Sequence, residues 1–349
     1  MAYKFIKYRM LPFVFSGPLS LVLEKLVTVK IIIPYYHMVS DDDITHTKHL
    51  YPHKTKKQFS EDLDYLCKNF LPVQLHDLLA HIKHNQPLPP KAFLLTFDDG
   101  FREMHDIVAP ILRKKGIPAT FFVNSSFTDN RNLCYQHKAS LIIEHLLTRG
   151  VSVSTQQMIE RLLPQRNQED TTTLYQRILA ISYAHKGVTD DIAKILELDT
   201  SDYLQTKRPY LTIKQINNLI ADGFTIGAHS IDHPQYSELT LDEQIRQTIE
   251  SVLFVRNTFH LDYGAFAFPH SDLGVTKQYF DSIAHAGLVD ISFGTAGLLD
   301  DCIPNNFQRL SLERPIIPAS DIIATSLVKN LYKSLKHDNK IMRPPSIRV

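Results

Sequence analysis

The alternation of apolar runs with helical patterns predicts an α/β fold, in which a parallel sheet is covered by helices. Short continuous apolar runs recur along the chain, and amphipathic helical patterns lie between them. The composition is that of an ordinary globular protein, with 44% hydrophobic and 21% charged residues. A closed barrel and an open, doubly wound sheet both satisfy this pattern.

The apolar runs are rich in β-branched and aromatic residues, as buried parallel strands are. They comprise Lys30–Tyr36, Ala92–Phe97, Ala119–Val123, Phe224–Ala228, Ala265–Phe268, Asp290–Phe293 and Phe307–Leu312. Because the carboxyl ends of parallel strands meet on one face of such a fold, the polar residues that follow these runs are candidates for a common site.

Helical patterns separate the strands, and several carry a threonine before the first turn or a glycine after the last. They comprise Gln58–Phe70, Asp106–Lys115, Thr212–Ala221, Leu241–Phe259 and Val275–Ala286. The segment 130–210 contains helical patterns and no clear strand, which predicts an all-α insertion. We divide the chain into an N-terminal helical segment (1–29), the α/β domain (30–336), which contains this insertion, and a tail (337–349) that we expect to be frayed.

The N-terminal segment has basic residues before the apolar run Leu11–Leu23, which resembles the start of a signal peptide. No small-residue cleavage site follows, and the run is shorter than the roughly 20 residues that span a bilayer. We expect a helix packed on the domain, whose basic end could also rest on a membrane surface. A cytoplasmic location, or one peripheral to the inner face of the membrane, is favoured.

Charge and cysteine content exclude several classes of protein. The 38 Lys and Arg residues nearly balance the 37 Asp and Glu residues, so nothing indicates a nucleic-acid partner. The 3 Cys residues form no CxxC pair, which excludes a disulfide scaffold and a thiolate zinc site. The generous count of 17 His directs attention to metal and proton-transfer chemistry.

Two predicted strand ends carry the residues of a candidate metal site. Asp98 and Asp99 follow one apolar run, and adjacent carboxylates there indicate a bound cation, with a turn capped by Asp as the alternative. His229 and His233 follow another run at a spacing that lets two imidazoles share one ion in a helical or tightly turned stretch. Two unrelated surface histidines are the alternative in a histidine-rich chain.

Read together, these motifs resemble those of a known family. The chain reads TFDDG at 96–100, ILRKKGIPATFF at 111–122, HSIDH at 229–233 and FAFPH at 266–270. This joint pattern resembles the polysaccharide deacetylases of carbohydrate esterase family 4, which share the NodB homology domain. The resemblance implies a distorted (β/α)7 barrel, with the all-α insertion 130–210 outside the shared part.

The resemblance also implies roles for residues at matching positions. Asp99, His229 and His233 match the family's metal ligands, and Asp98 matches the general base that takes a proton from water. One divalent ion is implied; Zn²⁺ suits two His and one Asp, and Fe, Co, Ni or Mn would also fit. A backbone N–H near Pro269 would stabilise the oxyanion.

The chain departs from the family at its last strand, which has no His to act as general acid. Its first strand ends instead at Tyr36 and His37, and in this it resembles circularly permuted exopolysaccharide deacetylases. Because the first and last strands of a closed barrel are neighbours, we expect His37 to protonate the leaving amine, with a strand-capping His as the alternative. Arg309 matches an Arg of the last strand in such members and could pair with Asp98, although another ion pair at the sheet end fits nearly as well.

A second departure is His270, which stands where the family usually has Tyr. We expect His270 and Pro269 to contact the substrate, together with Tyr36 and Asn124 at the ends of two other strands.

The sequence thus predicts a metal-dependent hydrolase that removes N-acetyl groups from amino sugars of a polysaccharide or glycan precursor. Two alternatives stay open. The same fold could cleave another non-peptide C–N bond, in an N-formyl sugar or a cyclic amide, or the barrel could be an inactive glycan-binding module. The presence of both Asp98 and Asp99 favours turnover, because a binding module does not need both.

Overall fold

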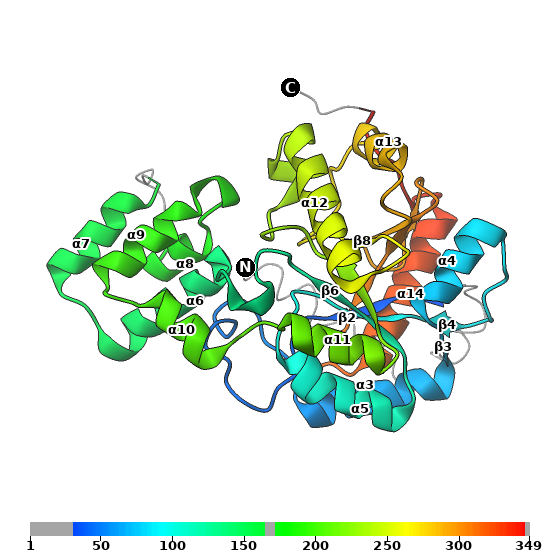
Figure 1. Ribbon diagram of the computed structural model, residues 1–349, viewed down its shortest axis with the longest axis horizontal. Helices are drawn as coiled ribbons and strands as arrows, with labels where there is room; N and C mark the ends of the chain where they lie inside the picture. Colours follow the sequence, from blue (N-terminus) through cyan, green and yellow to red (C-terminus); the bar gives the residue numbers. More distant parts are fainter. Residues whose placement is uncertain (1–30, 165–171, 346–349) are drawn as a thin grey trace.

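The computed structural model describes residues 31–164 and 172–345 (Figure 1). The N-terminal segment 1–29, predicted to be helical, lies outside the described residues. Within the described ranges, no helix combines the length and the apolar character needed to cross a membrane.

The centre of the molecule is a sheet of 8 strands in the order β11-β9-β8-β7-β6-β5-β2-β12. Its strands are β2 (Pro34–Tyr36), β5 (Leu95–Phe97), β6 (Ala119–Val123), β7 (Thr225–Ala228), β8 (Ala265–Ala267), β9 (Ile291–Gly294), β11 (Asn306–Gln308) and β12 (Leu310–Ser311), all paired in parallel. Arg309 alone separates β11 from β12, so one run of chain borders β9 on one side and β2 on the other. That run nearly closes the ring, and the predicted distorted barrel is confirmed.

Alternation along the strands separates the barrel interior from its outer face. On the outer face, Phe97 of β5 and Phe121 of β6 stack with their ring centroids 5.1 Å apart. In the interior, Thr120 and Thr225 share a hydrogen bond of 2.8 Å between their hydroxyls. Position 227 of β7 requires glycine, because a Cβ there would overlap a neighbouring phenylalanine ring in the interior.

Helices cover the outer face of the barrel (Figure 1). They are α3 (Lys56–Asn69), α5 (Ala109–Lys115), α11 (Ile213–Ala221), α12 (Leu241–Phe259), α13 (Lys277–Ala286) and α14 (Ala319–Leu335). Thr212 begins α11 with a capping box, and Gly116 and Gly287 end α5 and α13 in the left-handed conformation. α13 starts later than predicted because Thr276 caps it.

Two small sheets lie outside the barrel sheet. One contains β1 (Ile31–Ile32), β4 (Ala92–Phe93) and β3 (Leu71–Pro72), next in sequence to α4 (Leu75–His84), and the other pairs β10 (Asp300–Asp301) with β13 (Lys340–Ile341). The described part of the tail therefore differs from the frayed end that we predicted. Arg343 explains why, because its buried guanidinium forms ion pairs with Asp272 and Asp301.

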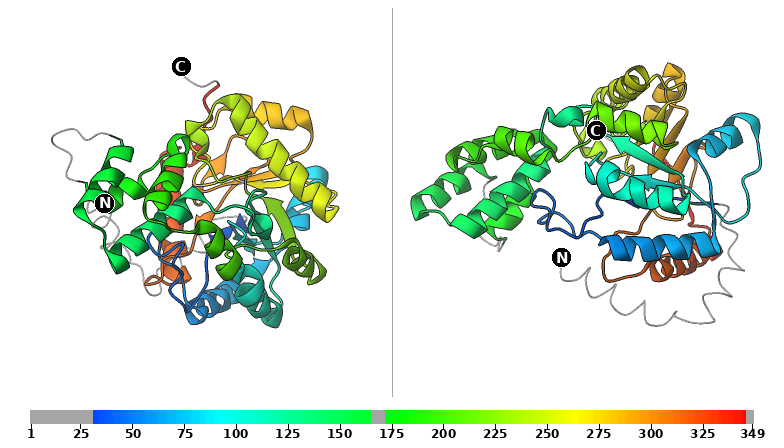
Figure 2. Two further views of the ribbon diagram at one scale, coloured as in Figure 1. Left: turned by 60° about the vertical axis from the view of Figure 1, so that its left-hand side comes forward. Right: turned by 60° about the horizontal axis from the view of Figure 1, so that its bottom comes forward.

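Between β6 and α11 the chain forms a set of helices that we call the helical insertion. Its members are α6 (Tyr135–Arg149), α7 (Val153–Leu162), α8 (Leu174–Leu179), α9 (Gly187–Ile195) and α10 (Thr200–Lys207). They form a lobe beside the barrel in every view (Figures 1 and 2). Because the chain enters this lobe after the carboxyl end of β6, the lobe starts on the face where the polar residues gather.

Candidate metal centre and active site

The predicted site residues follow strands at the carboxyl end of the barrel. Asp98 and Asp99 follow β5, His229 follows β7, His270 comes shortly after β8, and His37 follows β2. Because these strands are parallel members of one sheet, the fold gathers their ends on one face.

Asp99, His229 and His233 form a buried group that could hold one metal ion. The Oδ1 atom of Asp99 lies 3.4 Å from Nε2 of His229 and 3.2 Å from Nε2 of His233. Within the described part of the chain, none of these three buried atoms has a hydrogen-bond partner. Buried polar atoms without partners are rare, and three that converge fit the coordination of one cation. Two imidazole nitrogens and a carboxylate oxygen fit Zn²⁺ and other first-row divalent ions.

A hydrogen bond at the second nitrogen of each imidazole orients the ring to bind a cation through Nε2. Nδ1 of His229 lies 2.8 Å from the carbonyl oxygen of Ala267, and Nδ1 of His233 lies 3.1 Å from Oε1 of Gln136. With these acceptors, each ring carries its proton on Nδ1 and turns the lone pair of Nε2 toward Asp99. Burial lowers the pKa of His229 to about 4, so this ring is neutral at neutral pH and able to bind a cation.

Several residues of the site have a strained backbone conformation. Asp99, Ser230, His233 and His270 have φ values of 69°, 68°, 63° and 55°, in the left-handed region that residues other than glycine avoid. Each such residue costs about 1 kcal/mol or more, so the surroundings must hold it. Asn124 contributes to this support, because its side-chain amide donates to the carbonyl oxygen of His229.

Asp98 faces a different partner from its neighbour Asp99. Its Oδ1 and Oδ2 atoms lie 2.6 Å and 2.8 Å from Nη1 and Nη2 of Arg309, and both side chains are buried. Burial opposes ionisation of Asp98, but the paired guanidinium holds the pKa of this carboxyl below its usual value. Arg309 and Asp98 thus form a bidentate ion pair, which keeps the carboxylate charged and fixes its orientation.

His37 lies one strand away, beside the end of the last strand. β2 lies between β5 and β12, with Tyr36 paired to Phe97 and Tyr35 paired to Ser311. Continuing both registers places His37 next to Asp98 on one side and next to Glu313 on the other. Nδ1 of His37 lies 2.6 Å from Oε2 of Glu313.

The charge of His37 follows from this pair. Burial disfavours the charged ring, but the adjacent carboxylate of Glu313 outweighs that effect and raises the pKa of His37 to about 10. The imidazolium form is therefore the one present at neutral pH. Sequence reasoning missed Glu313, and the signal that could have found it is its position directly after the strand predicted to lie beside the first strand.

The structure does not bring every predicted residue to the site. Tyr36 is fully buried on the outer face of β2, where its hydroxyl donates to Asp62 of α3 at 2.9 Å, so it has no route to a substrate. Asn124 is also buried and supports the turn after β7 rather than facing the solvent. Pro269 is buried, whereas His270 is exposed, with its ring centroid 4.5 Å from that of His233.

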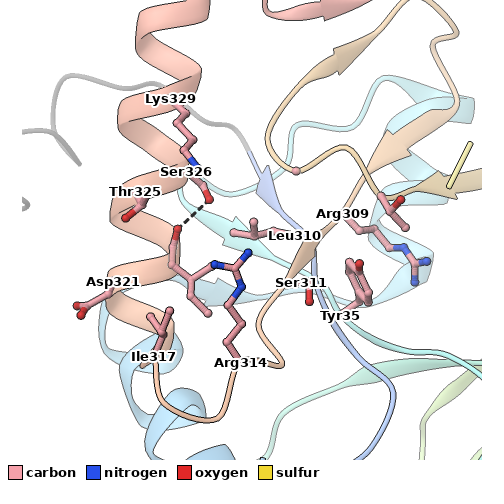
Figure 3. A pocket seen from close by; sticks show the side chains of 13 residues that line it. Tyr35, Arg309, Leu310, Ser311, Arg314, Ile317, Asp321, Thr325, Ser326 and Lys329 are labelled. Carbon is pink, nitrogen blue, oxygen red and sulfur yellow. Dashed lines mark hydrogen bonds between the residues drawn. The ribbon is translucent and has the colours of Figure 1, made fainter. Parts of the chain in front are cut away.

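Arg309 also borders a cavity of about 230 Å³ between β12 and α14 (Figure 3). Tyr35 and Arg309 line it at the barrel, and Asp321, Thr325 and Lys329 line it from α14. The guanidinium of Arg309 lies over the ring of Tyr35, 4.8 Å from its centroid. Arg309 thus contacts the Asp98 carboxylate and also lines the cavity.

The strand ends of this parallel barrel carry a buried Asp–His–His group, a carboxylate paired with arginine and a histidine paired with a carboxylate. These are the kinds of groups that a hydrolytic site uses. Residues 85–178 match the model of a family described as polysaccharide deacetylase. Over this range, which is less than half of its length, the chain is similar to polysaccharide deacetylases. The matched range includes Asp98 and Asp99, and it ends before His229 and His233.

Solved structures share the fold. The deacetylase PplD from Streptococcus pyogenes, solved in complex with acetate, is 15% identical with a TM-score of 0.54, over 86% of this chain and 99% of that chain. IcaB from Ammonifex degensii is 16% identical with a TM-score of 0.51, over 85% of this chain and 97% of that chain. A search of curated proteins finds no match to the sequence.

Proposed function

We propose that this protein is a metal-dependent deacetylase that removes N-acetyl groups from the amino sugars of a polysaccharide or glycan precursor. The observation that carries the proposal is the convergence of Asp99, His229 and His233, each with an unpartnered buried atom. The family match supports deacetylation, and the Streptococcus pyogenes deacetylase of the same fold was solved with acetate, the acid that such a reaction releases.

A divalent ion held by Asp99, His229 and His233 would polarise the acetyl carbonyl and make water a stronger acid. Asp98 accepts the proton of the attacking water, because its carboxylate stays ionised and does not belong to the group of three ligands. Arg309 holds both oxygens of that carboxylate and so fixes the direction from which the proton is taken. The backbone N–H of the turn at Pro269 and His270 is the proposed donor to the oxyanion.

The carbon–nitrogen bond breaks readily only when the leaving amine gains a proton. His37 supplies it in this proposal, since Glu313 keeps the ring charged at neutral pH. Because Glu313 occupies Nδ1, the proton leaves from Nε2. Asp98 and His37 therefore divide the work of base and acid between two neighbouring strand ends.

Acetate release from N-acetylglucosamine oligomers tests the proposal. Activity should disappear after chelation, return with Zn²⁺, and be absent from the double variant His229→Ala/His233→Ala. The matched control is His84→Ala/His285→Ala, which removes two exposed histidines that lie outside the motifs. Full activity of the first double variant, or formate release from N-formyl sugars with no acetate release, would overturn the proposal.

A further inference from the structure

Gln136, the second residue of α6, reaches from the helical insertion to the metal group. Its Oε1 atom lies 3.1 Å from Nδ1 of His233, and its Nε2 atom lies 3.1 Å from Nε2 of His270. One side-chain amide thus bridges a proposed metal ligand and the exposed histidine beside it. Neither the family motifs nor the matched roles include this residue.

The direction of the amide follows from a third contact. Sγ of Cys134 lies 3.3 Å from the same Oε1 atom, and a thiol donates to oxygen. The oxygen of Gln136 therefore faces His233, which must present a proton on Nδ1 and keep the lone pair on Nε2. The reverse direction would turn an N–H toward Nδ1 and move the proton to Nε2, where it would block metal binding.

The other end of the amide acts on His270. An amide nitrogen only donates, so Nε2 of His270 accepts and its proton resides on Nδ1. His233 and His270 both have left-handed backbone conformations, with φ of 63° and 55°, and depend on their contacts to stay in place. A single residue of the insertion thus sets the tautomer of two rings.

The insertion holds the same loop at a second point. The hydroxyl of Tyr183 donates to Asp232 at 2.8 Å, and Lys186 also pairs with this carboxylate. Asp232 directly precedes His233, so the helical insertion contacts two consecutive residues of the loop that follows β7. Contacts from the helical insertion therefore hold this loop in place at His233.

We propose that Gln136 is a positioning residue that holds His233 in its metal-binding tautomer and His270 in its accepting one. The inference rests on the proposed function in one respect, since it takes Asp99, His229 and His233 as metal ligands. It makes the helical insertion a determinant of metal affinity, and outer partners of this kind change affinity by about 10–100-fold when removed.

The test compares Gln136→Met, Gln136→Glu and the control Gln157→Met, which alters an exposed glutamine of α7. Zn²⁺ affinity is measured by competition with a chelating dye, and histidine tautomers by ¹⁵N NMR of the full chain before Zn²⁺ is added. Gln136→Met should weaken Zn²⁺ binding by about 10–100-fold and lose the Nδ1–H signal of His233. Gln136→Glu keeps the acceptor, so it should retain Zn²⁺ affinity while kcat/KM falls through the altered His270.

Zn²⁺ affinity and an Nδ1–H signal equal to wild type in Gln136→Met would overturn the inference. Thermal unfolding shows whether Gln136→Met is folded. If it is not, the test rests on Gln136→Glu, because weak Zn²⁺ binding by folded Gln136→Glu also contradicts the inference. Wild-type protein that binds Zn²⁺ but releases no acetate would defeat the proposed function and leave this inference standing. Wild-type protein that binds no Zn²⁺ would defeat both.

Discussion

Oε2 of Glu313 lies 2.6 Å from Nδ1 of His37, although 276 positions separate the two residues in the sequence. The other oxygen of this carboxylate accepts from the backbone N–H groups of His37 and Met38. The glutamate thus holds the ring and the backbone of the same residue. Its charge and its geometry both act on the proposed acid.

Replacing Glu313 with Gln should move the alkaline limb of the pH–rate profile to lower pH. The charge of Glu313 raises the pKa of His37 to about 10 against the effect of burial, and a neutral amide cannot do this. The limb of kcat/KM should shift by roughly one pH unit or more while bound metal is unchanged. The control Glu238→Gln alters an exposed carboxylate, and a shift equal in both variants would contradict the role of Glu313.

The same pair predicts a pH-dependent stability. The pKa of His37 is raised from 6.5 to about 10 on folding, so the stabilisation is fully present below pH 6.5 and is lost as pH rises toward 10. The difference in unfolding free energy between wild type and Glu313→Gln should therefore shrink over that range. Denaturant titrations at several pH values measure it, and a difference that grows with pH would refute the pairing.

His37→Ala should retain fold and metal but lose most turnover on amides. The loss should be smaller on activated esters, because their leaving groups need no proton. Hydrolysis of an N-acetyl sugar and of an activated acetate ester by the same preparation makes the comparison. Equal losses on both substrates would leave His37 as a histidine that caps a strand.

Asp98→Asn and Asp99→Asn should differ in their effect on bound metal. Asp98→Asn should keep the metal and cut turnover by about 10²–10⁴-fold, the usual contribution of a general base. Asp99→Asn should lose the metal as well, because its Oδ1 atom converges with the two imidazoles. Metal content is read by elemental analysis of the purified variants, and the opposite pattern would reverse the two roles.

Arg309→Met should destabilise the fold by about 3–5 kcal/mol, since it leaves a buried carboxylate without its charge partner. The double variant Arg309→Met/Asp98→Asn should recover much of this loss, because it removes the stranded charge too. Urea unfolding of the four proteins gives the coupling energy. Additive losses would show that the two side chains act independently.

Tyr36→Phe should lower stability by about 1–3 kcal/mol and leave KM unchanged. The hydroxyl donates to Asp62, a carboxylate that also pairs with Lys54, and it lies in the core. Unfolding free energy and KM are measured on one preparation. A raised KM at wild-type stability would restore the substrate contact predicted from the sequence.

The barrel and the gathering of its strand ends follow from the sequence, because continuous apolar runs and helix end signals define local structure. The placement of His37 beside the last strand follows from closure of the ring. Tyr36 shows where this reasoning fell short. Consecutive strand residues face opposite sides, so Tyr35 points toward Arg309 while Tyr36 points to the helices.

Glu313 and Gln136 show a different limit. A Gln near the start of a helix has no local signature of function, and a Glu after a strand acquires one only when the partner of that strand is known. Their roles depend on contacts with His37 and His233 across 276 and 97 positions. Such contacts depend on strand register and on how the insertion packs, which apolar periodicity does not specify.

The position of β2 between β5 and β12 has a consequence for biosynthesis. A chain made from its amino end produces His37 early and Glu313 only after the last barrel strand, and domains fold as they emerge. A nascent chain that ends before β12 can already contain Asp99, His229 and His233, yet β2 then has β5 as its neighbour and lacks β12. In the proposed mechanism, His37 gains its carboxylate partner only when β12 and Glu313 have been made and β12 has paired with β2, so a chain that ends before this point lacks the pair that charges His37.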